Sequence, residues 1–581
     1  MPDLGEEPYI HTDGVGTISK ELGDQIWDAL CKDRDEHYRK TAVQPSAYQI
    51  RFLGYKGVVG VDERLEGIKI RLRPSMNKFK IPGDEHAEIE IARAFERPGI
   101  TYLNKPLITI LEHRGVDKEA FMNLQRMAIA DIHAASDTMI LARQLFRSHS
   151  LGTSYRLPYI IQCLSSLGVG MKDERPQYVL EDKFIDRLIM FAKAHVLRDI
   201  KYAARIPVPN SYMLVGIADE GPAYENEGVE NVFKLEKGQV FACIHKPDED
   251  PIYLHGHVVI SRSPTVHPGD VQRVWAVGKP PPGRPCAFRN LKNVVVLPSV
   301  GERSLASCLG GGDLDGDQYS LIKEPSLLPT EHIEPASYES AGTQKLPDDA
   351  DSTIEDVCNF VVEYIESDIL GLLSDRHIII ADQSNLGPMD PKCIKLAQLC
   401  SQAVDYPKNG VPVNMKESPS RLIPFKPDWK KAEENMTRDS DYYESPRALG
   451  ELYRNITYKK PDSIHQAQST NGVAPSGPSM DSISQALFPL IMKHLGDPVN
   501  NDKDVGEMST IFHSYKHELR YMQLTHALSD SPDSRLEEEE VVVGNYSDQL
   551  QSASIQERPD LSHASSFRHC SQGYPTISLQ A

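Results

Sequence analysis

The sequence predicts an α+β protein in which two β-rich, barrel-like segments are joined and flanked by helices. Short runs of β-branched or alternating residues, divided by glycine and charge, occupy residues 1–95 and return between Pro and Gly turns at 205–323. Elsewhere, apolar residues recur at three- and four-residue spacing among good helix formers. Many short strands separated by turn signals are typical of barrel-like units.

Each expected element follows from a local run of residues. The first β-rich segment predicts strands at 47–52, 57–61 and 68–72. The second predicts strands at 212–217, 239–244, 256–260, 271–277, 294–297 and 318–322. Helical periodicity predicts helices within 121–145, 183–197, 354–373, 391–404 and 483–528.

The composition of the C-terminal part changes twice. Residues 459–480 are rich in Pro, Ser, Gly, Gln and Asn, which predicts a linker or flexible loop. From about Ser529 the chain is rich in Ser, Gln and acidic residues, which predicts a mostly disordered tail. The expected parts are a first barrel at 1–95, a helical connector at 96–204, a second barrel at 205–325, a helical head and neck region at 326–458, a linker with a helical segment at 459–528, and the tail at 529–581.

Length, charge and cysteine usage limit the class of protein. The 581 residues are enough for two to four domains, and no apolar run approaches the roughly 20 residues that span a bilayer. The net charge of -20 argues against a protein that coats nucleic acid by bulk attraction, yet residues 51–80 carry eight Lys or Arg against three acids. That stripe indicates a local polyanion site or a solvated strand face. Nine scattered cysteines without a CxxC pair predict reduced thiols in a soluble intracellular protein with no membrane contact.

The most informative stretch is Gly-Gly-Gly-Asp-Leu-Asp-Gly-Asp at 310–317. Asp313, Asp315 and Asp317 alternate, which places three carboxylates on one side of an extended segment, and the glycines let the backbone bend. Carboxylates this close raise one another's pKa, so the pattern predicts a bound cation. Oxygen ligands favour Mg²⁺, which commonly bridges substrate phosphates.

Other interpretations of the triplet stay open from the residues alone. An EF-hand calcium loop would also use these aspartates, but Gln318 stands where that loop needs glycine. A phosphatase of the haloacid-dehalogenase type carries an Asp-x-Asp-Gly element, although after a buried strand and not after three glycines. A glycosyltransferase Asp-x-Asp motif and an acidic surface turn are the remaining alternatives.

The aspartate motif and five further blocks resemble the cell-encoded RNA-dependent RNA polymerases of RNA silencing, in their fungal-type form. The blocks occur in the family's order and cover roughly residues 8–456. They lie at 11–16, 47–58, 72–79, 263–270 and 403–412.

The resemblance implies a fold, an activity and a set of site residues. The fold would hold two double-psi β-barrels, and the activity would be magnesium-dependent synthesis of double-stranded RNA on single-stranded RNA templates from nucleoside triphosphates, with proteins of RNA silencing as partners. Asp313, Asp315 and Asp317 would be catalytic and metal-binding. The positions that match the family's nucleotide-binding cations are Arg51, Lys56 and Lys78, suited to phosphate contact.

Family members usually carry several hundred residues ahead of the block at 11–16. We therefore expect a shortened form of the family whose first barrel lacks strands. The alternative function is a catalytically inactive, nucleic-acid-binding remnant of such a polymerase, and a phosphatase is the third choice.

Overall fold

The computed structural model describes the chain in segments. They are residues 1–32, 42–80, 86–180, 182–247, 249–337, 342–343, 345, 352–366, 369–431, 439–458, 481–495, 502–525, 536–544 and 576–580. The expected linker at 459–480 and most of the expected tail lie outside these residues. Within the described residues, no helix is both long and apolar enough to cross a membrane.

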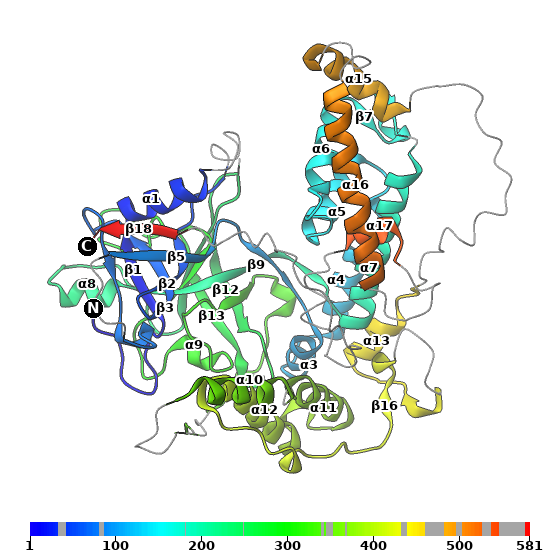
Figure 1. Ribbon diagram of the computed structural model, residues 1–581. Coiled ribbons are helices and arrows are strands. Elements are labelled where there is room, and N and C mark those ends of the chain that lie inside the picture. The colour runs from blue at the N-terminus through cyan, green and yellow to red at the C-terminus, as the bar shows by residue number, and fades with distance from the viewer. Residues whose placement is uncertain are drawn as a thin grey trace. The chain divides into compact units, whose positions relative to one another are not determined.

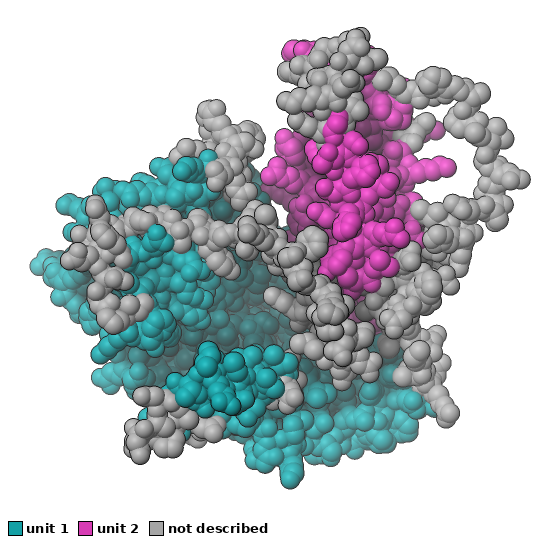
Figure 2. Space-filling model, in the orientation of Figure 1, with its two compact units in different colours: residues 1–121, 207–451, 568–581 teal, residues 122–206, 452–567 magenta. Residues whose placement is uncertain are grey.

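The chain divides into two compact units, coloured separately in Figure 2. Unit 1 comprises residues 1–121, 207–451 and 568–581. Unit 2 comprises residues 122–206 and 452–567.

The first sheet of unit 1 has six strands in the order β18-β5-β2-β3-β1-β4. Its strands are β1 (Val15–Ser19), β2 (Ala47–Phe52), β3 (Tyr55–Asp62), β4 (Ile70–Arg71), β5 (His86–Ala94) and β18 (Thr576–Gln580). β2 and β3 form an antiparallel hairpin, whereas β1 pairs with β3 in parallel. One face packs against helix α1 (Lys20–Leu30), whose Leu22 and Ile26 are fully buried with Ile18 and Ile50 (Figure 1).

The second sheet of unit 1 closes on itself. Its strands are β6 (Gly99–Tyr102), β9 (Pro207–Ala218), β10 (Gln239–Ile244), β11 (Ile252–Tyr253), β12 (His255–Arg262), β13 (Val271–Val277), β14 (Val294–Leu297) and β15 (Gln318–Ile322). The order is β11-β10-β13-β12-β15-β9-β14, and β14 also pairs with β10. That last pairing joins β10, β13, β12, β15, β9 and β14 into a ring, whose strands contribute most of one large hydrophobic core cluster.

Helices and a small sheet complete unit 1. They are α3 (Lys105–His113), α8 (Gly221–Asn226), α9 (Leu305–Cys308), α10 (Ile354–Glu366), α11 (Leu370–Gln383), α12 (Pro391–Asn409), and the pair β16 (Lys426–Pro427) and β17 (Tyr442–Tyr443). α11 and α12 pack through a core that contains Leu373, Ile380 and Leu396. This core fixes the end of α12, which carries Lys408.

Unit 2 is mainly helical. It holds α5 (Met139–Ser148), α6 (Leu157–Ser166), α7 (Lys183–Ala203), α15 (Ser482–Leu495), α16 (Asp502–Thr525), α17 (Glu538–Val543), and the short pair β7 (Val169–Gly170) and β8 (Tyr178–Val179). The helices α4 (Lys118–Ala134) and α13 (Ala448–Arg454) run across the sequence boundary between the units.

The described residues form a mixed fold of helices and sheets, as the sequence predicts. Nine strands expected from local runs are present, including β2, β10, β13, β14 and β15 with the expected bounds. The helical run at 121–145 is divided between α4 and α5, because Thr138 caps a new helix by accepting a hydrogen bond from Leu141 N–H. Composition predicts disorder from 529 onward, and the structure has α17 and β18 within that range.

Candidate active site

The aspartate triplet lies in a tight turn that enters β15. Gly310 and Gly311 adopt φ of 66° and 69°, in the left-handed region that glycine enters without steric cost. Gly316 adopts φ of 137°, where a Cβ would lie 2.3 Å from the Gln49 amide. The three glycines therefore provide both the conformation and the space that this turn requires.

Hydrogen bonds inside the turn hold the three carboxylates close together. Asp313 N–H donates to Asp317 Oδ2 at 3.0 Å, and Asp315 N–H donates to Asp313 Oδ1 at 3.2 Å. The fully buried Tyr319 on β15 donates its hydroxyl to Asp313 O at 2.7 Å. The turn is thus anchored on the barrel wall, so its carboxylates are not a loose acidic surface cluster.

The first sheet packs directly on this turn. Leu314 N–H donates to Asp13 O at 2.8 Å, and the Gln49 side-chain amide donates to Asp315 O at 2.9 Å. A Cβ on Gly14 would lie 2.7 Å from that of Asp315, so the loop before β1 needs glycine to approach so closely. Residues from both sheets therefore build one site.

Two of the carboxylates face a cationic side chain. Lys56 Nζ on β3 lies 2.6 Å from Asp315 Oδ2 and donates a hydrogen bond to it. Arg262 Nε at the end of β12 forms an ion pair with Asp317 Oδ2 at 2.6 Å. Both aspartates are about four-fifths buried, which strengthens these attractions relative to water.

Of the three aspartates, Asp313 has the negative charge that nearby cations compensate least. Its nearest cation, Lys408 Nζ on α12, lies 3.8 Å from Asp313 Oδ2 and is shared with Asp405 at 4.0 Å. The Lys408 side chain is 65% exposed, so solvent screens its charge. Asp313 is consequently the carboxylate that gains most from a further cation.

The pKa values follow from this uneven compensation. Burial, together with the charges of Asp315 and Asp317, raises the pKa of Asp313 to about 7. Burial also acts to raise the pKa of Asp315, but the hydrogen bond and charge of Lys56 outweigh it and the pKa is lowered. Burial raises the pKa of the neighbouring Asp13. The site therefore concentrates negative charge that its own cations only partly neutralise.

The chemistry of this donor set fits a hard divalent cation. Three carboxylates lie in one buried turn, and burial together with the neighbouring carboxylates raises the pKa of Asp313 to about 7. Among the described residues, however, no group of three or more His, Cys, Asp or Glu side chains is already arranged around one metal position. The reason is visible in the contacts above, since Asp315 and Asp317 each lie against a cationic side chain.

The three cations that the resemblance assigns to phosphate occupy different places. Lys56 contacts Asp315 directly. Arg51 on β2 is its cross-strand partner, with an exposed side chain that donates a hydrogen bond to the Ile50 carbonyl at 3.4 Å. Lys78 donates to Ser75 O at 3.1 Å, and its charge acts to lower the pKa of Asp13. The structure thus joins Lys56 to the turn and leaves Arg51 and Lys78 at its margin.

Sequence reasoning did not assign Arg262, Gln49 or Lys408 to the site. Arg262 directly precedes the block at 263–270, and Lys408 lies within the block at 403–412, so both were adjacent to recognisable signals. Asp13, whose backbone carbonyl accepts a hydrogen bond from Leu314 N–H in the aspartate turn, was not assigned to the site either. Only tertiary packing brings these side chains to Asp313, Asp315 and Asp317.

Comparison with known proteins identifies the family. The family model described as RNA dependent RNA polymerase matches residues 1–456. Because that match covers most of the chain, the chain belongs to the RNA-dependent RNA polymerase family.

Curated relatives and a solved structure agree with this assignment. The "Probable RNA-dependent RNA polymerase 1" of Oryza sativa subsp. japonica is 31% identical over 459 residues, which cover 79% of this chain and 55% of that protein. RNA-dependent RNA polymerase 1 of Schizosaccharomyces pombe is 29% identical, over 78% of this chain and 36% of that protein. The chain thus spans about half, or less, of the length of these relatives.

The solved structure of the RNA dependent RNA polymerase QDE-1 from Thielavia terrestris aligns with a TM-score of 0.58 at 20% identity. The alignment covers 86% of this chain and 54% of the other. At this level of identity the likeness shows a shared fold.

Proposed function

We propose that this chain carries out template-directed RNA synthesis, transferring nucleotides to an RNA 3′-hydroxyl on a single-stranded RNA template to make double-stranded RNA for RNA silencing. The observation that carries the proposal is the buried aspartate turn with Lys56 lying against Asp315. Membership of the RNA-dependent RNA polymerase family supports it. The substrates would be nucleoside triphosphates, and the partners the RNA template and proteins of RNA silencing.

In this proposal Asp313, Asp315 and Asp317 hold Mg²⁺. The ion would neutralise charge on the attacking and leaving oxygens of the transfer. Asp313 must release its proton to act as a ligand, and its pKa of about 7 makes that step strongly dependent on pH near neutrality. Arg262 keeps Asp317 in place at the base of the turn.

We further propose that Lys56, Arg51 and Lys78 bind the triphosphate. If Asp315 served as a metal ligand, Lys56, which now donates a hydrogen bond to it, would be available to a phosphate oxygen. Arg51 is adjacent to Lys56 across the hairpin and presents an exposed guanidinium suited to bidentate contact. Lys78 would add a third positive charge near Asp13.

The β-rich segments 1–95 and 205–325 would be the two double-psi barrels of the family. The closed ring of the second sheet, with parallel pairs β9–β14 and β10–β13, supports this for the second segment. The helical connector at 96–204 and the head and neck region at 326–458 complete the proposed layout. An intracellular location is proposed because eight cysteines of the described chain are free thiols.

The second candidate is a nucleic-acid-binding remnant without catalysis. It is favoured by one observation, that Asp315 and Asp317 lie against Lys56 and Arg262 and do not surround one point. The two candidates share a fold and differ only in whether the aspartates exchange these cations for a metal.

Incorporation of labelled nucleotide separates the two candidates. The chain is incubated with Mg²⁺ and either poly(C) or poly(A) template, each with labelled GTP or UTP. The proposal predicts GTP incorporation on poly(C) and UTP incorporation on poly(A), without the mismatched combinations, and loss of both in Asp315→Asn. Folded wild-type chain that binds template and incorporates nothing would favour the remnant.

A further inference from the structure

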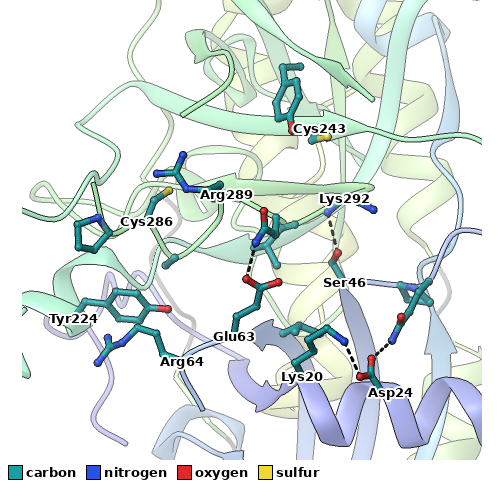
Figure 3. A pocket seen from close by; sticks show the side chains of 18 residues that line it. Lys20, Asp24, Ser46, Glu63, Arg64, Tyr224, Cys243, Cys286, Arg289 and Lys292 are labelled. Carbon is teal, nitrogen blue, oxygen red and sulfur yellow. Dashed lines mark hydrogen bonds and ion pairs between the residues drawn. The ribbon is translucent and has the colours of Figure 1, made fainter. Parts of the chain in front are cut away.

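A hollow of about 520 Å³ opens in unit 1, apart from the aspartate turn. Figure 3 shows its side chains, which come from α1, from the segment before β2, from the end of β3, from α8, β10 and β11, and from the loop before β14. The volume is that of a site for one small organic molecule. None of its lining residues belongs to the turn at 310–317.

The hairpin of β2 and β3 separates this hollow from the candidate active site. β3 begins beside Lys56 at the aspartate turn, and Glu63 and Arg64 follow its last residue at the hollow. Seven residues of extended chain from Lys56 to Glu63 span roughly 23 Å. Ser46, directly before β2, also lines the hollow. A ligand here would be remote from the carboxylates.

Two cations on the loop before β14 give the hollow its charge. The Arg289 guanidinium donates to the carbonyls of Pro280, Pro281 and Arg284, at 2.7 to 3.2 Å, which position it without neutralising it. Lys292 donates its backbone N–H to Ser46 Oγ at 2.8 Å, which fixes the residue at the wall. In the described part of the chain, the Lys292 ammonium has neither an ion pair nor a hydrogen bond.

Most of the other charged groups of the hollow are already paired. Lys20 pairs with Asp24 at 2.6 Å, and Arg64 pairs with Glu227 at 3.0 Å. Glu63 accepts a hydrogen bond from the Asn290 amide. The positive charges of Arg289 and Lys292 therefore remain unpaired, and Glu63 is the one carboxylate of the hollow without an ion pair among the described residues. This excess of positive charge favours an anionic ligand.

The walls between these charges are apolar and aromatic. Val61 and Leu291 supply aliphatic surface, and Tyr253 supplies a ring whose hydroxyl hydrogen-bonds the Cys243 thiol. Such a surface suits a flat organic group, while Lys292 and Arg289 suit an anion. A second thiol, Cys286, lines the hollow and is partly accessible.

We propose that this hollow binds a small phosphorylated ligand of mononucleotide size, with its phosphate at Lys292. The volume, the uncompensated cations and the apolar walls together select this class of ligand over a metal ion or an apolar molecule. The proposal is independent of RNA synthesis, because none of these residues takes part in the metal site.

The test uses Cys286 as a reporter in the full chain. Its alkylation by iodoacetamide is followed by peptide mass spectrometry, in EDTA, with AMP, adenosine or a short RNA without terminal phosphate. At AMP ten times above its dissociation constant, alkylation of Cys286 should slow about tenfold, since only the free fraction reacts. The exposed Cys358 on α10 should react at an unchanged rate.

Matched variants assign the binding to the hollow. Lys292→Gln should weaken AMP protection about tenfold or more, because a charge-assisted hydrogen bond is lost. That ammonium has no partner in the described protein, so the variant should keep the wild-type melting temperature. Arg273→Gln, an exposed change of the same charge on β13, should leave protection intact.

Four results would overturn the proposal. They are no protection by AMP, equal protection by adenosine, protection by RNA but not by AMP, and loss of protection in Lys56→Gln with retention in Lys292→Gln. The third would indicate a nucleic-acid surface, and the fourth would place AMP at the aspartate turn. Failure of RNA synthesis would leave all these readouts unaffected.

Discussion

Asp313 carries the main electrostatic cost of the candidate active site. It is buried beside two further carboxylates, and its only cationic neighbour within ion-pair distance among the described residues is the exposed Lys408. A folded protein accepts such a cost most readily where a ligand relieves it. The expected consequence is a stability that depends on pH and on divalent metal.

We predict that Asp313→Asn is more stable than wild type at pH 8 in metal-free buffer. The pKa of Asp313 is raised from its ordinary value to about 7 in the folded chain, so between pH 4 and 7 the folded chain binds more protons than the unfolded one. This contribution to stability therefore falls as pH rises through that window and levels off above it. The difference should reach on the order of 1 to 3 kcal/mol, measured by urea unfolding.

Tryptophan fluorescence suits this measurement, because Trp27, Trp275 and Trp429 all lie in unit 1. Saturating Mg²⁺ should remove the advantage of the variant by stabilising only the wild type. A difference that does not change between pH 4 and 8 would show that Asp313 is not held at a raised pKa.

Arg73 in unit 1 forms a buried ion pair with Glu220. Its fully buried guanidinium donates to both Glu220 oxygens, at 2.9 and 2.7 Å, and to Val15 O at 2.7 Å. We predict that Arg73→Ala destabilises unit 1 by about 3 to 5 kcal/mol, because Glu220 would be left as a buried unpaired charge. Urea unfolding followed by tryptophan fluorescence provides the measurement.

The exposed pair of Lys395 with Glu417, at 3.0 Å, offers the control. Lys395→Ala should change the free energy of unfolding by less than about 1 kcal/mol. If the two variants lose equal stability, the burial of Arg73 does not govern its contribution.

At the residue scale, the sequence predicts the three aspartates as site residues but not the side chains that contact them. Asp313, Asp315 and Asp317 stand in one local motif, and Lys56 lies in a recognisable block. Arg262 and Lys408 reach the turn from β12 and α12, which lie about fifty and ninety residues away in sequence. No local pattern marks such contacts, because tertiary packing alone creates them.

Among the elements, β3 has the central position. It pairs with β1 and β2, carries Lys56 at one end and meets the further hollow at the other. Its glycines differ in the space around them. A Cβ at Gly57 would lie 2.2 Å from Gly14 O, whereas one at Gly60 would make an ordinary 3.5 Å contact with Ile217.

We predict that Gly57→Ala lowers the stability of unit 1 by about 1 to 3 kcal/mol, the usual cost of overpacking. The Gly14 carbonyl accepts the Val58 N–H at 3.0 Å, so a displaced Gly14 also loses this hydrogen bond. Thermal unfolding in metal-free buffer is the measurement. Gly60→Ala serves as the matched control in the same strand and should be neutral or slightly stabilising. Equal losses in both variants would contradict the role assigned to the close approach of Gly14.

Element types were predictable where the pattern is local. The strands β2, β10, β13, β14 and β15 follow from runs of β-branched or alternating residues. The short strand β1 was not predicted, because its five residues gain their strand character from pairing with β3. The acidic run at 537–540 leads into helix α17, where Arg187 pairs with Glu539 at 2.7 Å, a partner that composition could not indicate.

For the whole molecule, local sequence patterns could not predict that the second sheet closes into a ring. It depends on the pairing of β10 with β14, whose residues lie more than fifty positions apart. The chain's charge of -20 likewise hides a local excess of cations, of which Lys56 reaches the aspartate turn. Family membership, in contrast, was evident from ordered blocks and is confirmed by the family model over residues 1–456.

The most direct test of the central claim is the binding of Mn²⁺, as a stand-in for Mg²⁺, followed by electron paramagnetic resonance. The account predicts that wild-type chain binds Mn²⁺ at pH 8 and more weakly at pH 6, because Asp313 takes up a proton. Asp315→Asn should weaken binding about tenfold or more. Asp375→Asn, which removes an exposed carboxylate on α11, should bind as wild type does. Equal Mn²⁺ affinity in wild type and Asp315→Asn would contradict the claim that the aspartate turn is the metal site.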